Sequence, residues 1–177
     1  HGTFYELPAE NADGFAKVRP VASHSFRIHD YASYRGMLIM TGVDPEAGRD
    51  NPHIIVSDDD KAAVWAGVID DLWKMGKPSG TGGPWFKTPV KEGVPSDPYL
   101  IGYYDDRELV LSHDRDGPVN FTIEMDPMGQ GPWMKYMQVE VQPGLEWRHI
   151  FPGGFHARWI RFVADRDCTA TAWLTYK

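Results

Sequence analysis

The sequence has little cysteine, few basic residues and no long apolar run. Its single cysteine, Cys168, cannot form an internal disulfide, and we expect a buried structural thiol there. No stretch approaches the roughly 20 apolar residues that a membrane-spanning helix needs. With 18 Lys and Arg against 25 Asp and Glu, the net charge of −7 argues against nucleic acid, which is bound through basic surfaces. We therefore expect neither a nucleic-acid partner nor a membrane partner.

Helical periodicity and common catalytic motifs are scarce as well. Only residues 64–73 carry apolar residues at helical spacing, and we interpret them as a strand that runs into a loop. The sequence contains no G-x-S-x-G elbow, P-loop or dinucleotide fingerprint. These signals leave open whether the protein is an enzyme.

Glycine, proline and aromatic residues are plentiful, and apolar residues alternate with polar ones in several short segments. The alternation is clearest over residues 119–125, 137–142 and 170–176, and Asp, Gly and Pro separate these segments at turns. Short alternating strands joined by such turns are typical of a β-sandwich or a barrel. We predict an all-β protein in which residues 99–177 form an antiparallel, jelly-roll-like β-sandwich.

The first part of the chain has a different pattern. Residues 35–42 form a nearly continuous apolar run, as expected for a strand buried on both faces. Residues 53–57 and 62–69 flank an acidic turn and predict a hairpin. Residues 79–98 are rich in Gly and Pro, which favours a linker. We predict that residues 1–78 are β-hairpins resembling a blade of a propeller.

Several segments resemble parts of long secreted proteins of polysaccharide-degrading bacteria. The segments are Arg27–Tyr31, Ser33–Gly36, Lys61–Trp65, Asp70–Lys74, Gly76–Pro78 and Pro95–Tyr99. The resemblance covers most of the chain and implies propeller-like blades followed by a β-sandwich, in a secreted or periplasmic protein. In that family a segment similar to His1–Tyr5 lies in the interior of the chain, which favours a fragment of a longer protein. The family implies no catalytic residue.

The initial residue, His1, also permits another interpretation. Its α-amine and imidazole could together chelate Cu(II), with a second imidazole from His24 or His29. Those two histidines are five residues apart, so on a flat strand they would face opposite sides, and only a bend would let both reach one metal. An axial tyrosine such as Tyr34 or Tyr104 would complete the site. The alternative is a cut chain end with unrelated histidines.

Acidic clusters suggest a calcium site, for which Asp114 and Asp116 beside Asn120 are the best candidates. No cluster has the EF-hand spacing. The competing interpretation is that these carboxylates cap turns through local hydrogen bonds.

The neighbouring acids Asp70 and Asp71 are the best candidates for acid–base catalysis. They lie among apolar and aromatic residues, where burial can shift a pKa. Adjacent residues on a strand face opposite ways, so one of them at most would point into a pocket. The competing role is a structural one, in which they bind loop backbone or arginine.

Aromatic residues near turns suggest carbohydrate binding, because pyranose rings stack on such side chains while polar neighbours bind their hydroxyls. The candidate ligand-binding residues are Trp73, Trp85, Tyr103, Tyr104, Trp133 and Trp147. For each of them the alternative is a place in the core.

These patterns together predict an extracellular glycan-associated module of a larger carbohydrate-active protein, with a polysaccharide or oligosaccharide partner. One alternative is a copper-dependent polysaccharide oxidase that uses His1. A second is a structural domain that packs on a neighbouring domain or self-associates through strand edges.

Overall fold

The protein is all-β. The computed structural model describes residues 2–6, 19–46, 50–129 and 131–177. Strands hold 52% of the residues and helices 4%, which confirms the predicted fold class. The chain forms two compact units: unit 1 contains His1–Phe4 and Val21–Pro78, and unit 2 contains Tyr5–Pro20 and Ser79–Lys177. Among the described residues, no helix is both long and apolar enough for a membrane span.

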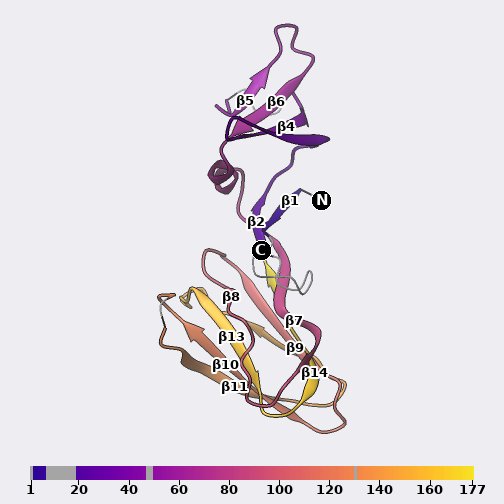
Figure 1. Ribbon diagram of the computed structural model, residues 1–177, viewed down its shortest axis with the longest axis vertical. Helices are drawn as coiled ribbons and strands as arrows, with labels where there is room; N and C mark the ends of the chain where they lie inside the picture. The colour runs from indigo at the N-terminus through magenta and orange to yellow at the C-terminus, as the bar shows by residue number, and fades with distance from the viewer. Residues whose placement is uncertain (1, 7–18, 47–49, 130) are drawn as a thin grey trace. The chain divides into compact units, whose positions relative to one another are not determined.

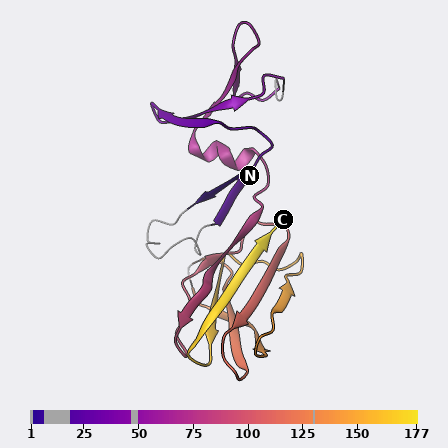
Figure 2. The same cartoon turned by 90° about the vertical axis from the view of Figure 1, so that its right-hand side faces the viewer.

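Unit 2 is a jelly-roll sandwich of two four-stranded antiparallel sheets (Figures 1 and 2). One sheet has the order β12-β9-β14-β7 and the other the order β11-β10-β13-β8. Each strand is followed in the chain by a strand of the other sheet, except that β10 is followed by its own neighbour β11, which gives the double Greek key order of a jelly roll. The strands are β7 (Gly80–Val90), β8 (Tyr99–Leu100), β9 (Arg107–His113), β10 (Val119–Asp126), β11 (Met134–Val141), β12 (Trp147–Ile150), β13 (Trp159–Ala164) and β14 (Cys168–Tyr176).

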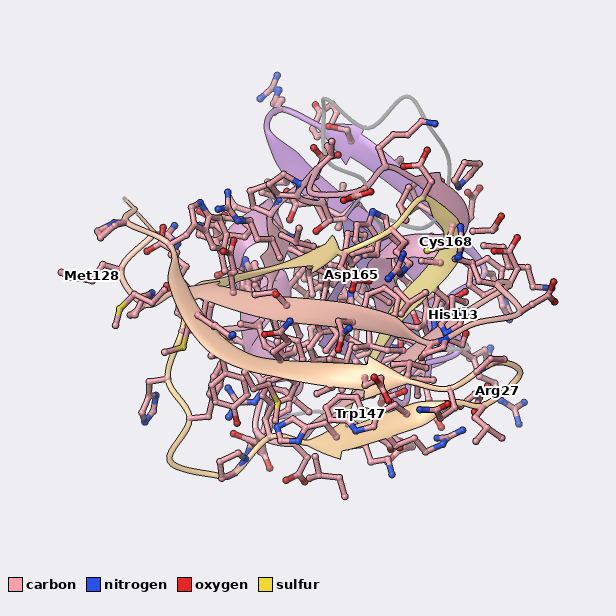
Figure 3. All side chains as sticks on the ribbon, turned by 90° about the horizontal axis from the view of Figure 1, so that it is seen from below. Arg27, His113, Met128, Trp147, Asp165 and Cys168 are labelled. Carbon is pink, nitrogen blue, oxygen red and sulfur yellow. The ribbon has the colours of Figure 1, made fainter. Side chains whose placement is uncertain are left out.

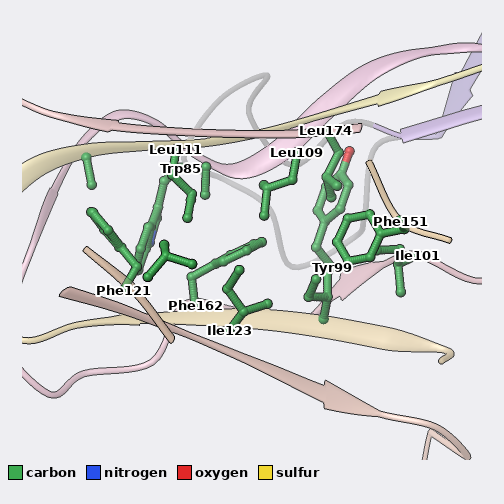
Figure 4. Close-up of a cluster of buried hydrophobic side chains, with 14 of the residues drawn as sticks. Trp85, Tyr99, Ile101, Leu109, Leu111, Phe121, Ile123, Phe151, Phe162 and Leu174 are labelled. Carbon is green, nitrogen blue, oxygen red and sulfur yellow. The ribbon is translucent and has the colours of Figure 1, made fainter. Parts of the chain in front are cut away.

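The core of unit 2 comes from the inward-facing half of each alternating strand. Along β14 every second residue from Ala170 to Tyr176 is buried, as the alternation predicts. Aromatic rings fill the space between the sheets, with the Trp85 ring centroid 6.0 Å from that of Phe162 and 6.4 Å from that of Phe121 (Figure 4). At one end, Tyr176 Oη donates a 2.7 Å hydrogen bond to the Leu100 carbonyl oxygen.

The predicted linker over residues 79–98 is wrong, because β7 is the first strand of the jelly roll. It pairs with β14 from the Gly80–Tyr176 pair to the Val90–Cys168 pair. Glycine is needed at Gly83, where a Cβ would collide with the carbonyl oxygen of Ala172. Proline is tolerated because β7 lies at the edge of its sheet, where a missing N–H breaks no inner ladder.

Unit 1 contains a four-stranded antiparallel sheet of two hairpins, with the order β3-β4-β6-β5. Its strands are β3 (Asp30–Tyr34), β4 (Met37–Val43), β5 (Ile54–Val56) and β6 (Ala63–Gly67). The hairpin predicted on either side of the acidic turn is present as β5 and β6. A two-stranded ribbon pairs β1 (Thr3–Glu6) with β2 (Arg19–Ser23).

Two local predictions for unit 1 are corrected. The segment after β6 is a 3-10 helix, η2 (Ile69–Lys74), rather than a loop; the side chain of Asp71 accepts the Val68 N–H and so supports its first turn. β4 was expected to be buried on both faces. Only Met40 and Val43 are fully buried on it, because a single small core covers one face of the sheet.

Candidate functional site

An aromatic and polar patch lies on the outward face of the sheet β11-β10-β13-β8. Arg161 lies between Ile160 and Phe162, which are fully buried in the core, so its side chain points away from the core. The Cζ atom of Arg161 is 4.3 Å from the ring centroid of Trp133, the residue before β11. Trp133 is half-buried, so part of its ring remains open to solvent.

Glu124 fixes the position of Arg161. The two residues are opposite each other on β10 and β13, and Arg161 Nε donates a 2.6 Å hydrogen bond to Glu124 Oε2. Their side chains are 24% and 22% exposed, so solvent screens this ion pair less than a pair on an open surface. The guanidinium is therefore held over the Trp133 ring by a partner of opposite charge.

Further hydrogen-bonding groups lie beside this pair. Lys135 of β11 is opposite Glu124, and Lys135 Nζ donates a 2.7 Å hydrogen bond to Gln138 Oε1. The patch thus combines an indole ring with a guanidinium, a carboxylate, an ammonium and an amide. We name Trp133, Glu124, Lys135, Gln138 and Arg161 the Trp133 patch. These groups could stack on the C–H face of a sugar and bind its hydroxyls.

A buried carboxylate organises the loop that leads to Trp133. Asp126 is 4% exposed, and its Oδ1 accepts the N–H groups of Met128 (3.1 Å) and Gly129 (2.8 Å). Its Oδ2 accepts the Gly131 N–H at 2.7 Å. Met128 projects from the tip of this loop (Figure 3). Three backbone donors on one carboxylate give the loop a defined conformation rather than a random one.

The same loop packs on a second tryptophan of the sheet, Trp159. A Cβ on Gly129 would lie 2.5 Å from Arg158 Cδ and 3.2 Å from Trp159 Nε1, so the loop backbone lies against these two side chains. The Cζ atoms of Arg158 and Arg19 lie 6.0 Å and 5.9 Å from the Trp159 ring centroid. Trp159 is partly buried against the core and contacts this loop and two arginines.

Two predicted ligand-binding residues lie in the core instead, so those predictions are wrong. Trp85 and Tyr104 are each 6% exposed. Tyr104 stacks on Tyr176 with ring centroids 3.7 Å apart and donates a hydrogen bond to the Pro20 carbonyl oxygen. Burial raises the pKa of Tyr104 far above its usual value, which keeps the phenol neutral. Neither ring is available to a ligand on the surface.

The remaining predicted aromatic residues are dispersed. Trp147 of β12 packs against the core and stacks on His149, with ring centroids 5.5 Å apart and an interplanar angle of 8°. Tyr103 is exposed in the turn between β8 and β9, and Trp73 is half-exposed on η2 of unit 1. Of the six candidates, Trp133 alone combines partial exposure with a surround of polar side chains on a sheet face.

Comparison with known proteins adds nothing to this geometry: no family model, curated protein or solved structure matches the chain.

The two candidate catalytic acids have structural surroundings. Asp71 accepts hydrogen bonds from Val68 N (2.9 Å) and from Lys74 Nζ (2.9 Å). The hydrogen bond from Lys74 is the main cause that lowers the pKa of Asp71, which opposes a role as a general acid at neutral pH. Asp70 is exposed beside it. The structural interpretation of this pair is thus the one that the contacts favour.

The predicted calcium ligands are not brought together. Asn120 Nδ2 donates a 2.9 Å hydrogen bond to Asp165 Oδ2, and Asp114 Oδ1 accepts the Thr169 N–H at 2.7 Å. Asp114 and Asp116 line an open cleft of about 560 Å³ together with Lys91, but Asn120 does not. Over residues 2–6, 19–46, 50–129 and 131–177, no three His, Cys, Asp or Glu side chains form a group suited to a metal. Asp114 and Asn120 instead form hydrogen bonds with β14 and with the turn before it.

The copper proposal can be tested only in part, because His1 lies outside the described residues. His24 Nδ1 accepts the Phe26 N–H at 3.1 Å, and its ring lies between those of Phe4 and Phe26. Partial burial lowers the pKa of His24. His29 packs against Gly42, where a Cβ would lie 2.7 Å from the imidazole Cγ. Both histidines thus have local packing roles.

Cys168 is half-buried at the start of β14, which is more open than the buried thiol we expected. Burial raises the pKa of its thiol, so the group is a weaker nucleophile than an ordinary cysteine.

The sequence did not identify the residues that complete the patch. Arg161 and Glu124 are outward positions of alternating strands, which the pattern does show. What it could not show is that β10 and β13 are neighbours in the sheet, because residues 127–158, which contain β11 and β12, separate the two strands in the chain.

Proposed function

We propose that unit 2 is a glycan-binding module, non-catalytic by itself, that acts as part of a larger secreted or periplasmic carbohydrate-active protein. Its binding site is the Trp133 patch. The observation that carries the proposal is the Trp133 ring, half-open to solvent and fixed by Arg161, which is itself held by Glu124.

The chemistry of the patch supports a sugar ligand. A pyranose offers an apolar C–H face and a rim of hydroxyl groups, which match an indole ring surrounded by charged and amide side chains. Because Arg161 is neutralised by Glu124, the patch does not require an anionic ligand. Lectin domains also use the jelly-roll fold, and this analogy of fold agrees with a sugar ligand.

Retention on insoluble glycans tests the proposal. The full chain is run through affinity gels, and in parallel is sedimented with insoluble glycan; the glycans tested are cellulose, xylan, mannan, chitin, agarose and alginate. We expect retention on at least one of them, and a reduction of at least about tenfold in affinity, or about 1.4 kcal/mol, for Trp133→Ala. Arg161→Ala should weaken binding as well, because the indole loses the group that orients it.

Trp73→Ala is the matched control, since it removes an exposed tryptophan of unit 1 that is outside the patch. It should leave retention unchanged. Absence of retention of the wild-type chain on every glycan, or equal losses for Trp73→Ala and Trp133→Ala, would contradict the proposal.

A structural role is the second candidate, because β3 leaves an open sheet edge. It is an edge strand, and all five of its residues are exposed, Tyr31 and Tyr34 among them. An open edge can pair with another strand. Under this alternative the chain self-associates, and Ser33→Pro makes it monomeric in sedimentation experiments, because Ser33 and Leu38 form a non-hydrogen-bonded pair and the Ser33 N–H faces the open edge.

A copper oxidase based on His1 remains the other alternative from the sequence. Copper titration followed by EPR separates it from the module. If one extra residue before His1 leaves the Cu(II) affinity unchanged, the oxidase proposal fails.

A further inference from the structure

A second aromatic surface lies on the outward face of the other sheet, β12-β9-β14-β7. Trp173 of β14 lies between Ala172 and Leu174, which are fully buried, so it points away from the core. Its ring centroid is 4.9 Å from that of Phe86 on β7. Phe86 is 55% exposed although its neighbour Trp85 is in the core.

An irregularity in β7 presents Phe86 on this face. The pairing of β7 with β14 shifts register on both sides of the Trp85–Ala172 pair. The next residue, Lys87, has a φ of +50°, a conformation that side chains other than glycine rarely adopt. Two side-chain hydroxyls hold this bend: Thr171 Oγ1 accepts the Lys87 N–H at 3.1 Å, and Thr88 Oγ1 accepts the Phe86 N–H at 3.0 Å.

The aromatic pair continues into a row across the sheet. Trp173 is opposite Val110 of β9, and Val110 is opposite Arg148 of β12. Residues directly opposite in antiparallel strands lie on the same face, so ring, aliphatic and guanidinium groups are adjacent. Along β14, Thr171 and Thr175 lie two residues to either side of Trp173 and share its face.

The surround of this surface is polar. Arg148 Nη1 donates a 3.0 Å hydrogen bond to Glu108, and Arg148 Nη2 donates a 2.7 Å bond to Glu146. Glutamate is depleted at the centres of protein–protein interfaces, and two glutamates lie beside Arg148 on this surface, whereas hydroxyl and charged groups around exposed rings suit a sugar. The flanking hydroxyls and ion pairs therefore favour a glycan over a protein partner.

We propose that Phe86 and Trp173 form a second glycan-binding surface, so that unit 2 holds one polysaccharide chain on each of its two sheets. This inference rests on the proposed function. The two surfaces belong to different sheets of one sandwich and face away from a shared core, so one chain of sugar cannot occupy both by a direct path. Such a module cross-links soluble polysaccharide.

The experiment measures cross-linking separately from binding. The full chain is mixed with a soluble form of the glycan that retains the wild type, and light scattering reports aggregates while affinity electrophoresis reports binding. The variants are Trp133→Ala, Trp173→Thr and the double variant. Threonine is chosen because it matches Thr171 and Thr175 on the same strand and favours β structure.

We expect the wild type to increase scattering and each single variant to lose this effect while it still binds. Each single variant keeps one site and loses the avidity of two, so its apparent affinity for the glycan should fall at least tenfold. The double variant should not bind. Ile55→Thr, which removes an exposed apolar side chain of unit 1, is the control that should retain both properties. Phe86→Ser repeats the test at a more exposed position, should Trp173→Thr unfold.

Three results would overturn the second surface. If Trp173→Thr and Phe86→Ser scatter and bind as the wild type does, the surface takes no glycan. If Trp133→Ala alone removes all binding, the proposed function stands with one site. If the wild type is a dimer that Trp173→Thr converts to a monomer, the surface contacts a second copy of the chain instead. Failure of the wild type to bind any glycan removes the proposed function and this inference together.

Discussion

The phenol of Tyr176 joins the two sheets of the sandwich through the backbone of Leu100. Tyr176 is on β14 and Leu100 is on β8, so their 2.7 Å hydrogen bond runs from one sheet to the other. Both residues are buried. Burial raises the pKa of Tyr176 well above its usual value, so the phenol keeps its proton and remains a donor.

Tyr176→Phe should therefore destabilise unit 2 although it removes a single oxygen atom. The Leu100 carbonyl oxygen would lose a buried donor, at a cost of about 1–2 kcal/mol in the free energy of unfolding. Urea unfolding of the full chain measures this loss. Tyr103→Phe removes a phenol that is 74% exposed and should change stability by less than about 0.5 kcal/mol. Equal effects of the two changes would contradict the prediction.

Trp85→Ala should act on folding rather than on ligand binding. Trp85 fills the space between Phe121 and Phe162 at the centre of the core, and its truncation leaves a cavity. Loss of a buried aromatic side chain costs about 3–5 kcal/mol. Differential scanning calorimetry should show a large fall in the unfolding temperature of unit 2, whereas Trp133→Ala should show a small one. A Trp85→Ala chain of normal stability would place this ring outside the core.

Asp126→Asn should loosen the loop that carries Trp133. The amide presents one oxygen acceptor where the carboxylate presents two, so at least one of the three N–H groups loses its partner. We expect a loss of about 1–3 kcal/mol and faster hydrogen exchange at Met128, Gly129 and Gly131. Exchange measured by NMR tests this.

Asp116→Asn is the control for that change, since Asp116 is an exposed carboxylate on another turn. Unchanged exchange rates at the three loop amides in Asp126→Asn would show that the carboxylate does not hold the loop.

Acid should destabilise unit 2 partly through Asp167. The hydrogen bond from Lys91 Nζ, with a further one from the Glu92 N–H, lowers the pKa of Asp167 below its usual value of about 3.8. A lowered pKa in the folded state adds stability above the unfolded pKa, and this stability is lost as pH falls through the folded value. Urea unfolding at pH 5 and pH 2.5 measures the change, which should be smaller in Asp167→Asn. The same pH dependence in wild type and variant would contradict it.

The sequence was informative where alternation determines structure. The alternation predicts Val119, Phe121, Ile123 and Met125 on one face of a strand; the first three are fully buried on β10, and Met125 is partly buried against the same core. Burial of one face of a half-exposed strand is a local property, and period two reveals it. The jelly-roll fold class followed from repeated segments of this kind.

Composition was misleading where tertiary contacts decide. Gly82, Gly83 and Pro84 resemble a linker, yet close approach to β14 and an edge position make them suitable for a strand. Likewise, of the adjacent aromatic residues Trp85 and Phe86, the first is buried in the core and the second is exposed, and the register shifts of β7 determine which is buried. Partners such as Glu124 and Arg161 depend on strand order, which no local pattern contains.

The place of β14 in its sheet has a consequence for synthesis. It lies between β7 and β9, and β12 joins the same sheet through β9. The first strand of the sandwich to be synthesised, β7, therefore has no neighbour in its sheet until the last one, β14, has been made. While the ribosome is still translating the intervening residues, β7 presents unpaired edges and inward-facing Trp85 without a core. Unit 2 must therefore fold after β14 has emerged, and until then the nascent chain depends on protection from aggregation.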